Sequence, residues 1–265
     1  MKWNEAILLV EHRQDVELDK FYTNPKVAKE CISKLNLSEY TRIIEPSAGS
    51  GSFSSQIPRV EAYDLKPEGK NIKQQDFLKL RISKKPNDKI LVIGNPPFGF
   101  RSNLALSFIN HAAEFADTIA MILPITFARY SLYNRINKKV HMVKYYTLER
   151  NSFTVNGRPY NVNCGFFIFK VKDTERPKAA VLTTSDFKFV KKGQEDFRII
   201  RKGWSAGKIA PDRISDYNCF FIKSNINPSL LKNKFRKIDF SSAKNNVMGS
   251  NSLTMQEIIA GYNKV

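Results

Sequence analysis

The sequence is poor in cysteine, histidine and long apolar runs. Its 265 residues include three cysteines, far apart and odd in number, and three histidines. That set fits neither a disulfide framework nor a metal-ligand spacing, so it favours a reducing compartment and predicts no metal site. No apolar run approaches the roughly 18 residues that a membrane span needs, and the run near the N-terminus is too short for a signal peptide. We expect an intracellular, cytoplasmic protein without a membrane partner.

Acidic residues are also scarce relative to basic ones. The chain carries 43 Lys+Arg against 25 Asp+Glu, a formal net charge of +18. Residues 174–265 hold 17 basic and 8 acidic residues, so the basic excess is densest there. Such an excess favours a polyanionic partner, because phosphates that bind Lys and Arg release condensed counterions. The alternative is a basic surface that serves solubility alone.

Apolar segments typical of buried strands alternate with helical segments in the first two thirds of the chain. The strand-like segments are residues 41–47, 59–65, 89–97 and 118–124, and the helical ones are 26–35 and 102–117. Residues 140–153 and 161–172 fit a closing hairpin. Strands that alternate with helices favour an α/β fold with a mainly parallel sheet covered on both faces.

The polar, proline-containing segment at residues 174–178 indicates a domain junction. It predicts one domain over residues 1–173 and a small basic C-terminal region over residues 174–265. Within that region, residues 228–238 fit a basic helix. Residues 254–262 fit a final helix that begins with a capping box formed by Thr254 and Glu257.

A glycine-rich turn follows the first strand, in the segment EPSAGSGSF at residues 45–53. Gly49 and Gly51 permit a tight turn and a close approach of the backbone to a ligand. The spacing departs from the full dinucleotide fingerprint and there is no Walker lysine. Asp64, where the next strand ends, is placed to accept ribose hydroxyls. Asp76 and Phe77 fit the edge and face of an adenine, although each of these signals alone also fits a structural role.

The most specific motif is GNPPFGF, at residues 94–100. Its two prolines bar a helix and fix the backbone. The side-chain carbonyl of Asn95 and the backbone carbonyl of Pro96 can then accept both hydrogens of one amino group. Phe98 can stack on the ring that bears this group. The alternative is a rigid turn, built on Pro96 and Pro97, that closes a strand.

Together these motifs resemble the S-adenosylmethionine-dependent amino-methyltransferases with an Asn-Pro-Pro-Phe motif, and in particular the gamma-type adenine-N6 DNA methyltransferases. FYTNP at residues 21–25 occupies the family's opening position, EPSAGSGSF the glycine-rich one and NPPF the catalytic one. The resemblance covers about residues 20–170. It implies a Rossmann-like class I methyltransferase fold, with a seven-stranded, mostly parallel sheet and a closing antiparallel hairpin. It also implies S-adenosyl-L-methionine as cofactor.

The resemblance assigns roles to individual residues. Asn95, Pro96, Pro97 and Phe98 would be catalytic. Phe153 would pack against the target base, and the alternative is that it is an ordinary core residue. Many DNA enzymes of this type have Tyr where Phe98 stands, and stacking does not need the hydroxyl. The cofactor would be held by Tyr22, Thr23, Glu45, Pro46, Ala48, Gly49, Gly51, Asp64, Leu65, Asp76, Phe77 and Asn95.

Residues 191–208 interleave cations with aromatic residues, the combination used for phosphate contact and base stacking. The candidate nucleic-acid contacts here are Arg198, Arg201, Lys202 and Trp204, and Arg101 is a further candidate just past the NPPF motif. A solvated basic face around a core tryptophan is the alternative. The C-terminal region is short for a separate target-recognition domain, and a partner subunit is left open.

The sequence therefore predicts transfer of a methyl group from S-adenosylmethionine to the N6 amino group of adenine in DNA, as in restriction–modification. The mechanism would be in-line transfer that relies on positioning and electrostatics. The alternatives are adenosine in RNA, a glutamine side chain in a protein, and an inactive subunit that only binds nucleic acid.

Overall fold

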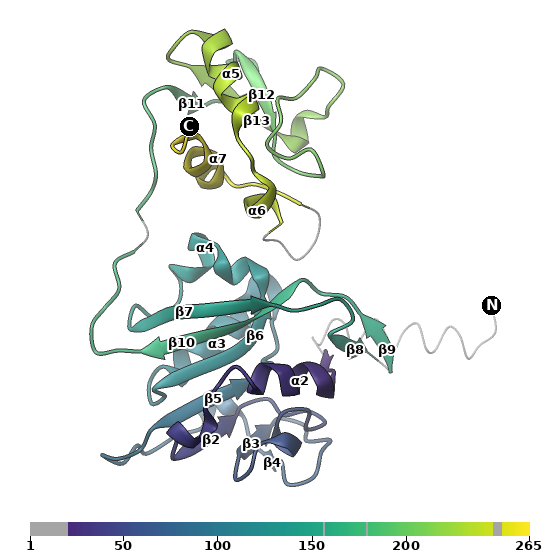
Figure 1. The fold of residues 1–265 in the computed structure, drawn as a ribbon, viewed down its shortest axis with the longest axis vertical. Helices are drawn as coiled ribbons and strands as arrows, with labels where there is room; N and C mark the ends of the chain where they lie inside the picture. The colour runs from purple at the N-terminus through teal and green to yellow at the C-terminus, as the bar shows by residue number, and fades with distance from the viewer. Residues whose placement is uncertain (1–20, 156, 179, 246–250) are drawn as a thin grey trace, which may run out of the picture. The chain divides into compact units, whose positions relative to one another are not determined.

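The computed structural model describes residues 21–155, 157–178, 180–245 and 251–265. The apolar run near the N-terminus lies outside these residues. The chain divides into two compact units, the first ending at Lys178 and the second following it (Figure 1). No helix in the described ranges is long and apolar enough to cross a membrane.

The first unit is built on a seven-stranded sheet with the order β4-β3-β2-β5-β6-β10-β7. The strands from β4 to β6 are parallel, whereas β10 runs antiparallel to both β6 and β7. This confirms the predicted seven-stranded, mostly parallel sheet with a closing antiparallel pair. The strands are β2 (Arg42–Glu45), β3 (Glu61–Asp64), β4 (Lys73–Gln74), β5 (Ile90–Gly94), β6 (Thr118–Pro124), β7 (Val140–Thr147) and β10 (Cys164–Val171).

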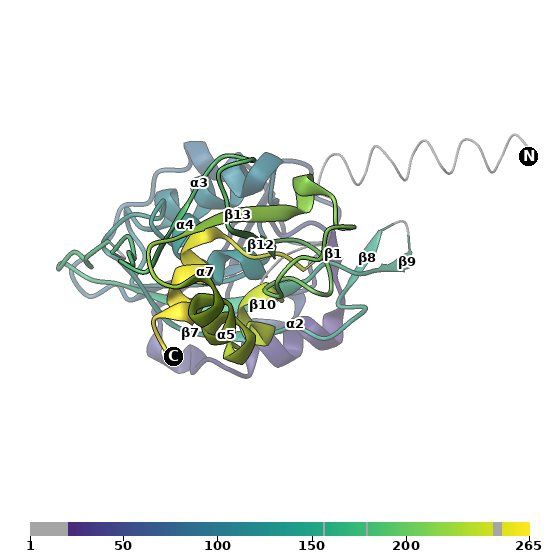
Figure 2. The ribbon, with the colours of Figure 1, turned by 90° about the horizontal axis from the view of Figure 1, so that it is seen from above.

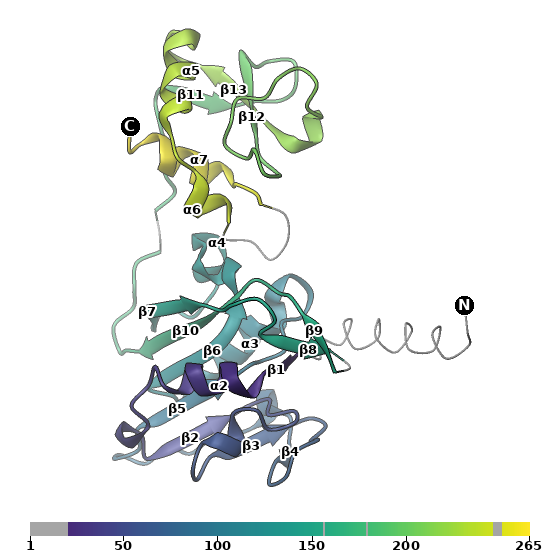
Figure 3. The same cartoon turned by 45° about the vertical axis from the view of Figure 1, so that its right-hand side comes forward.

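The central strands β5 and β6 are buried along their whole length, as expected for apolar runs covered on both faces. Helices α2 (Pro25–Ile32) and α3 (Asn103–Ala112) cover opposite faces of the sheet, as Figures 2 and 3 show. The Asn24 side chain caps α2 by accepting from the Lys26 amide, and Pro25 suits its first turn. The short helix α4 (Tyr130–Tyr133) lies between β6 and β7 in the chain.

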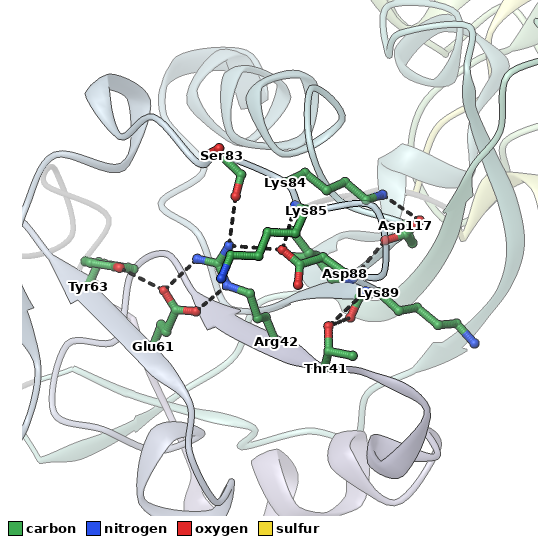
Figure 4. Close-up of polar contacts among 11 residues, drawn as sticks. Thr41, Arg42, Glu61, Tyr63, Ser83, Lys84, Lys85, Asp88, Lys89 and Asp117 are labelled. Atoms are coloured by element: carbon green, nitrogen blue, oxygen red, sulfur yellow. Dashed lines mark hydrogen bonds and ion pairs between the residues drawn. The ribbon is translucent and has the colours of Figure 1, made fainter.

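A network of charged side chains fastens the amino ends of the parallel strands (Figure 4). Arg42 of β2 forms a two-point ion pair with Glu61 of β3, with Nε–Oε1 and Nη2–Oε2 distances of 2.7 and 3.0 Å. Asp88 lies 3.7 Å from the same guanidinium, and Asp117 accepts from the Ile90 amide at 2.8 Å. The network leaves the opposite, carboxyl ends of these strands available for a ligand.

A second, three-stranded sheet has the order β1-β8-β9 and consists of β1 (Tyr22–Thr23), β8 (Phe153–Val155) and β9 (Arg158–Tyr160). The predicted closing pair of residues 140–153 and 161–172 is present as β7 and β10, but its first strand stops short of residue 153. Strand β7 ends at Thr147, and Asn151, with φ of 62°, turns the chain before β8. The separate strand arises because β8 pairs with β1, joining Thr23 to Phe153.

The second unit has its own core. Its antiparallel sheet has the order β11-β13-β12, with strands β11 (Phe187–Phe189), β12 (Phe197–Ile200) and β13 (Cys219–Ser224). Helices α5 (Pro228–Lys237), α6 (Ser241–Lys244) and α7 (Met255–Tyr262) accompany it. The capping box of Thr254 and Glu257 is present as predicted. The rings of Phe187, Phe235 and Tyr262 meet in the core, with centroids 5.1–5.4 Å apart.

Candidate active site

A cavity of about 500 Å³ opens where β2, β3 and β5 end. Glu45 closes β2, Asp64 closes β3 and Asn95 follows β5, and all three line the cavity. Ligands of open parallel sheets bind at these carboxyl ends. The predicted site residues that the cavity brings together are Tyr22, Thr23, Glu45, Pro46, Ala48, Gly49, Asp64, Leu65, Asp76, Phe77, Asn95 and Pro97.

The glycine-rich turn is tied to the end of β3 through one carboxylate. The Gly49 amide donates to Asp64 Oδ2 at 2.7 Å, and the Lys66 amide donates to Oδ1 at 2.8 Å. Gly49 has φ of 52°, which a side chain would disfavour. Because each carboxylate oxygen can accept two hydrogen bonds, Asp64 retains acceptor capacity for two donors such as ribose hydroxyls. Gly51 belongs to the same turn but does not line the cavity.

Asp76 and Phe77, which follow β4, also line the cavity. Asp76 Oδ1 accepts from the Leu78 amide at 3.0 Å and so caps a short 3-10 turn. The Phe77 ring is buried and packs 5.2 Å from the Phe108 ring. Tyr22 and Glu68 are lining residues too, and the Tyr22 hydroxyl donates to the Glu68 carboxylate at 2.8 Å, which links β1 to the loop after β3.

Glu45 is the most deeply buried acid that lines the cavity, with 2% of its surface exposed. Burial raises the pKa of its carboxyl to about 8, against the opposing effect of hydrogen bonds from Ser54, and the nearby Asp64 charge adds to the rise. Among the residues that the structure describes, its Oε2 atom has no hydrogen-bond partner. Such an orphaned buried acceptor fits a cationic or hydrogen-bond-donating ligand in the cavity.

Asn95 has a fixed side chain with one unused acceptor. Its Nδ2 donates to the Phe21 carbonyl at 2.9 Å, and its backbone carbonyl accepts from Ser47 Oγ at 3.0 Å. Its buried Oδ1 has no partner within the described ranges. Pro96 next to it is buried and does not line the cavity, so the predicted second acceptor stays a prediction.

An aromatic cluster lies beside Asn95. Phe98 stacks on Phe21 with centroids 5.9 Å apart, and Phe21 also stacks on Tyr160 at 5.2 Å. Phe153 approaches Phe21 edge-on at 6.4 Å. Both Phe98 and Phe153 are buried in this arrangement. The sequence analysis missed Phe21, although it directly precedes Tyr22 in the opening motif, and it missed Tyr160 because the β8–β9 hairpin was not predicted.

The candidate nucleic-acid contacts lie in different environments. Arg101 and Ser102 both adopt left-handed conformations, with φ of 53° and 62°, and Arg101 is exposed with its guanidinium 5.0 Å from the Phe100 ring centroid. In the second unit, the Arg198 guanidinium donates to Asp216 at 2.6 Å and to two backbone carbonyls. By contrast, Lys202 and Trp204 are exposed.

The order of the sheet, with β10 as the one strand antiparallel to its neighbours, defines a class I methyltransferase type of fold around this cavity. Residues 55–158 match the family model of the EDM2 methyltransferase-like domain. None of the curated proteins matches the sequence at a significant level.

Several solved structures are similar in fold. One is a protein from Pyrococcus horikoshii provisionally assigned as an RNA methyltransferase, with 16% identity, TM-score 0.46, and coverage of 59% of this chain and 88% of that one. The 23S rRNA methyltransferase ErmE has 16% identity and TM-score 0.40, over 58% and 71% of the two chains. A modification subunit of a provisionally assigned type I restriction enzyme from Vibrio vulnificus has 12% identity and TM-score 0.40, over 95% and 62%.

Proposed function

We propose that the protein transfers a methyl group from S-adenosylmethionine to the exocyclic N6 amino group of an adenine in nucleic acid, with DNA as the first substrate to test. The observation that carries the proposal is the Asn95 side chain. Its Oδ1 is a buried acceptor without a partner among the described residues, and the bond from Nδ2 to the Phe21 carbonyl holds it in place. An amino group is the natural occupant, because it supplies the donor that this acceptor lacks.

The residues around the cavity fit the proposed cofactor. The turn at Gly49 leaves room for close approach of a ligand, and Asp64 keeps acceptor capacity for ribose hydroxyls. The orphaned Oε2 of Glu45 suits the cationic methionine end. The cofactor, when bound, supplies an activated methyl group on a sulfonium centre.

The chain's own residues would contribute position and electrostatics rather than a nucleophile. Asn95 Oδ1 would accept a hydrogen from the amino group, orient the nitrogen and stabilise the positive charge that develops on it. Phe98 would supply a stacking surface for the adenine ring once its contact with Phe21 opens. The formal net charge of +18 supports a substrate in which the adenine is part of a polyanion.

The test is the transfer of radiolabelled methyl from S-adenosylmethionine to double-stranded DNA, single-stranded DNA, structured RNA and a protein extract in parallel. Labelled products are digested to nucleosides, and Asn95→Ala serves as the control. The proposal expects label in N6-methyldeoxyadenosine or N6-methyladenosine that is lost in Asn95→Ala, and the sugar identifies DNA or RNA. Label confined to protein would overturn the nucleic-acid substrate, and no label on any substrate would overturn the transfer itself.

A further inference from the structure

The second unit displays an indole ring to solvent on a loop that is itself firmly held. Trp204 is 83% exposed and lies in the segment 201–208, which follows β12. The Gly203 amide donates to the Asn251 carbonyl at 2.7 Å, and the Gly207 amide donates to the Ile200 carbonyl at 2.7 Å. Lys202 pairs with Ser252 in an antiparallel bridge. The backbone that carries the exposed ring is therefore ordered. This order lowers the entropic cost of binding a ligand through the ring.

The cations of the second unit differ in whether a carboxylate pairs with them. Four of them form ion pairs with aspartates at 2.6–3.1 Å, namely Lys192, Arg198, Lys223 and Lys234. In the described part of the second unit, Arg201, Lys202, Lys208 and Lys244 form no ion pair with a carboxylate. These four are the ones that belong to the 201–208 loop or contact it, since Lys244 Nζ donates to the Trp204 carbonyl at 3.0 Å. Other cations without an ion pair, such as Lys188 and Arg213, lie elsewhere in the described part of the second unit.

Two of these four cations lie close to exposed rings. Lys244 Nζ lies 5.3 Å from the Trp204 ring, and the Arg201 guanidinium lies 6.0 Å from the ring of Tyr217, which is 75% exposed. A single exposed aromatic residue is ordinary on a protein surface. Rings that alternate with cations free of carboxylate partners are what single-stranded nucleic acid requires, since bases stack on the rings and phosphates pair with the cations.

We infer that the 201–208 loop, with Lys244 and Tyr217, is a binding platform for a single-stranded segment of nucleic acid, with one base stacked on Trp204 and its phosphates held by Lys202 and Lys208. A paired base keeps both faces covered by its neighbours in the duplex, so the Trp204 ring selects unpaired nucleotides. Arg198 has no part in the platform, because its guanidinium is committed to Asp216.

The inference rests on the proposed nucleic-acid substrate, but its test uses no methyl donor. The chain has two tryptophans, so a Trp3→Phe background leaves Trp204 as the only indole emitter. In that background we titrate a 12-nucleotide single strand, its duplex, and inorganic polyphosphate as an anion without bases. We expect the single strand to quench Trp204 emission and polyphosphate to bind without quenching.

Anisotropy of the labelled single strand then measures affinity. Trp204→Ala should weaken binding by about 5- to 150-fold, the range measured for one base–aromatic stack, and Trp204→Phe should restore most of it. Lys202→Ala with Lys208→Ala should flatten the salt dependence by about 0.7 per lost phosphate contact. Leu230→Ala, which removes an exposed side chain from α5, is the matched control and should bind as the parent does.

Equal affinity of the parent and Trp204→Ala for the single strand, or duplex binding tighter than single-strand binding, would overturn the platform. The two proposals fail separately. Quenching by the single strand without methyl transfer to any substrate would leave the platform standing and overturn the activity. Methyl transfer by a Trp204→Ala variant that binds the single strand normally would leave the activity standing and overturn the platform.

Discussion

The side-chain amide of Asn95 donates to the backbone carbonyl of Phe21 at 2.9 Å, which fixes its Oδ1 atom as the free acceptor. The bond joins the loop after β5 to the residue just before β1, two segments that are 74 positions apart in the chain. A backbone carbonyl cannot donate, so it dictates which way the amide faces. The orientation of the proposed catalytic group is thus set before any substrate arrives.

This relationship predicts the effect of Asn95→Asp, which keeps an acceptor but loses the donor to Phe21. The carboxylate would face the Phe21 carbonyl oxygen and turn away from it, so the acceptor would no longer be held. We expect the methyl-transfer rate to fall about 10²- to 10³-fold, the usual cost of losing one pre-oriented polar group. The same substitution at Asn103, an exposed position at the start of α3, should leave the rate unchanged. Wild-type activity in Asn95→Asp would show that the bond to Phe21 is irrelevant.

Glu45 should make stability depend on pH in a known direction. Burial raises the pKa of its carboxyl to about 8 in the folded protein, above the ordinary value of 4.5. The folded state therefore holds a proton that the unfolded state releases, and this contribution to stability is complete below about pH 4.5. It is lost as the pH rises towards 8, and the loss then levels off.

Urea unfolding of the wild type and of Glu45→Gln between pH 5 and 9 tests this expectation. The carboxamide does not titrate, so the variant should gain stability relative to the wild type as the pH rises from 5 to 8. The difference between the two should be constant above pH 8. A difference that is independent of pH across the whole range would contradict the raised pKa.

The local sequence carried enough information for the main sheet and most of the cavity. The continuous apolar runs of β5 and β6 can only be buried between two layers, and the glycines after β2 mark a turn at the carboxyl end of the sheet. Parallel strands bring such ends to one edge. For this reason Glu45, Asp64 and Asn95, which are far apart in sequence, were predicted together and line one cavity.

Long-range pairing was what the sequence could not provide. Strand β1 has two residues, and its partner β8 lies more than 120 positions away, so neither has a periodic pattern of its own. Phe21 and Tyr160 were missed because they meet only through this pairing. In the second unit, β12 was not predicted. Its alternation of Phe197, Arg198 and Ile199 was interpreted as part of a basic patch rather than as a half-buried strand.

The ion pair between Arg42 and Glu61 should contribute to stability, because it is bidentate and both side chains are largely shielded from solvent. Their exposed fractions are 26% and 29%. The hydrogen bond from Arg42 is the main cause that lowers the pKa of Glu61. Arg42→Met should therefore lower the free energy of unfolding at pH 7 by about 1–2 kcal/mol. The loss should shrink in the acidic range in which Glu61 takes up its proton, because a protonated carboxyl no longer forms the ion pair with Arg42.

Lys89→Met is the matched control for that experiment. Lys89 also pairs with a glutamate, Glu39, at 3.0 Å, but both side chains are nearly half exposed and solvent screens the pair. Urea unfolding should show little change for Lys89→Met. Equal losses for the two variants would indicate that the Arg42 pair is no stronger than an ordinary surface pair.

Alanine substitutions at two glycines of the second unit should distinguish the cost of steric overlap from the cost of backbone strain. Gly207 and Gly193 both have positive φ, of 96° and 86°. A Cβ at Gly207 would overlap the buried Phe240 ring, whereas a Cβ at Gly193 would meet nothing within 4 Å. Gly193→Ala should lower the free energy of unfolding by about 1 kcal/mol, the cost of the backbone strain alone. Gly207→Ala should lower it by roughly 2–4 kcal/mol, because overpacking against Phe240 is added.

Urea unfolding followed by circular dichroism measures both losses. Because Gly207 closes the loop that presents Trp204, Gly207→Ala should also weaken binding of the single strand at temperatures where the protein remains folded. Gly193→Ala, which lies outside that loop, should bind normally. If both variants lose the same stability, Phe240 does not confine the loop. If Gly207→Ala binds normally despite its lower stability, the exposure of Trp204 does not depend on how tightly the loop is packed.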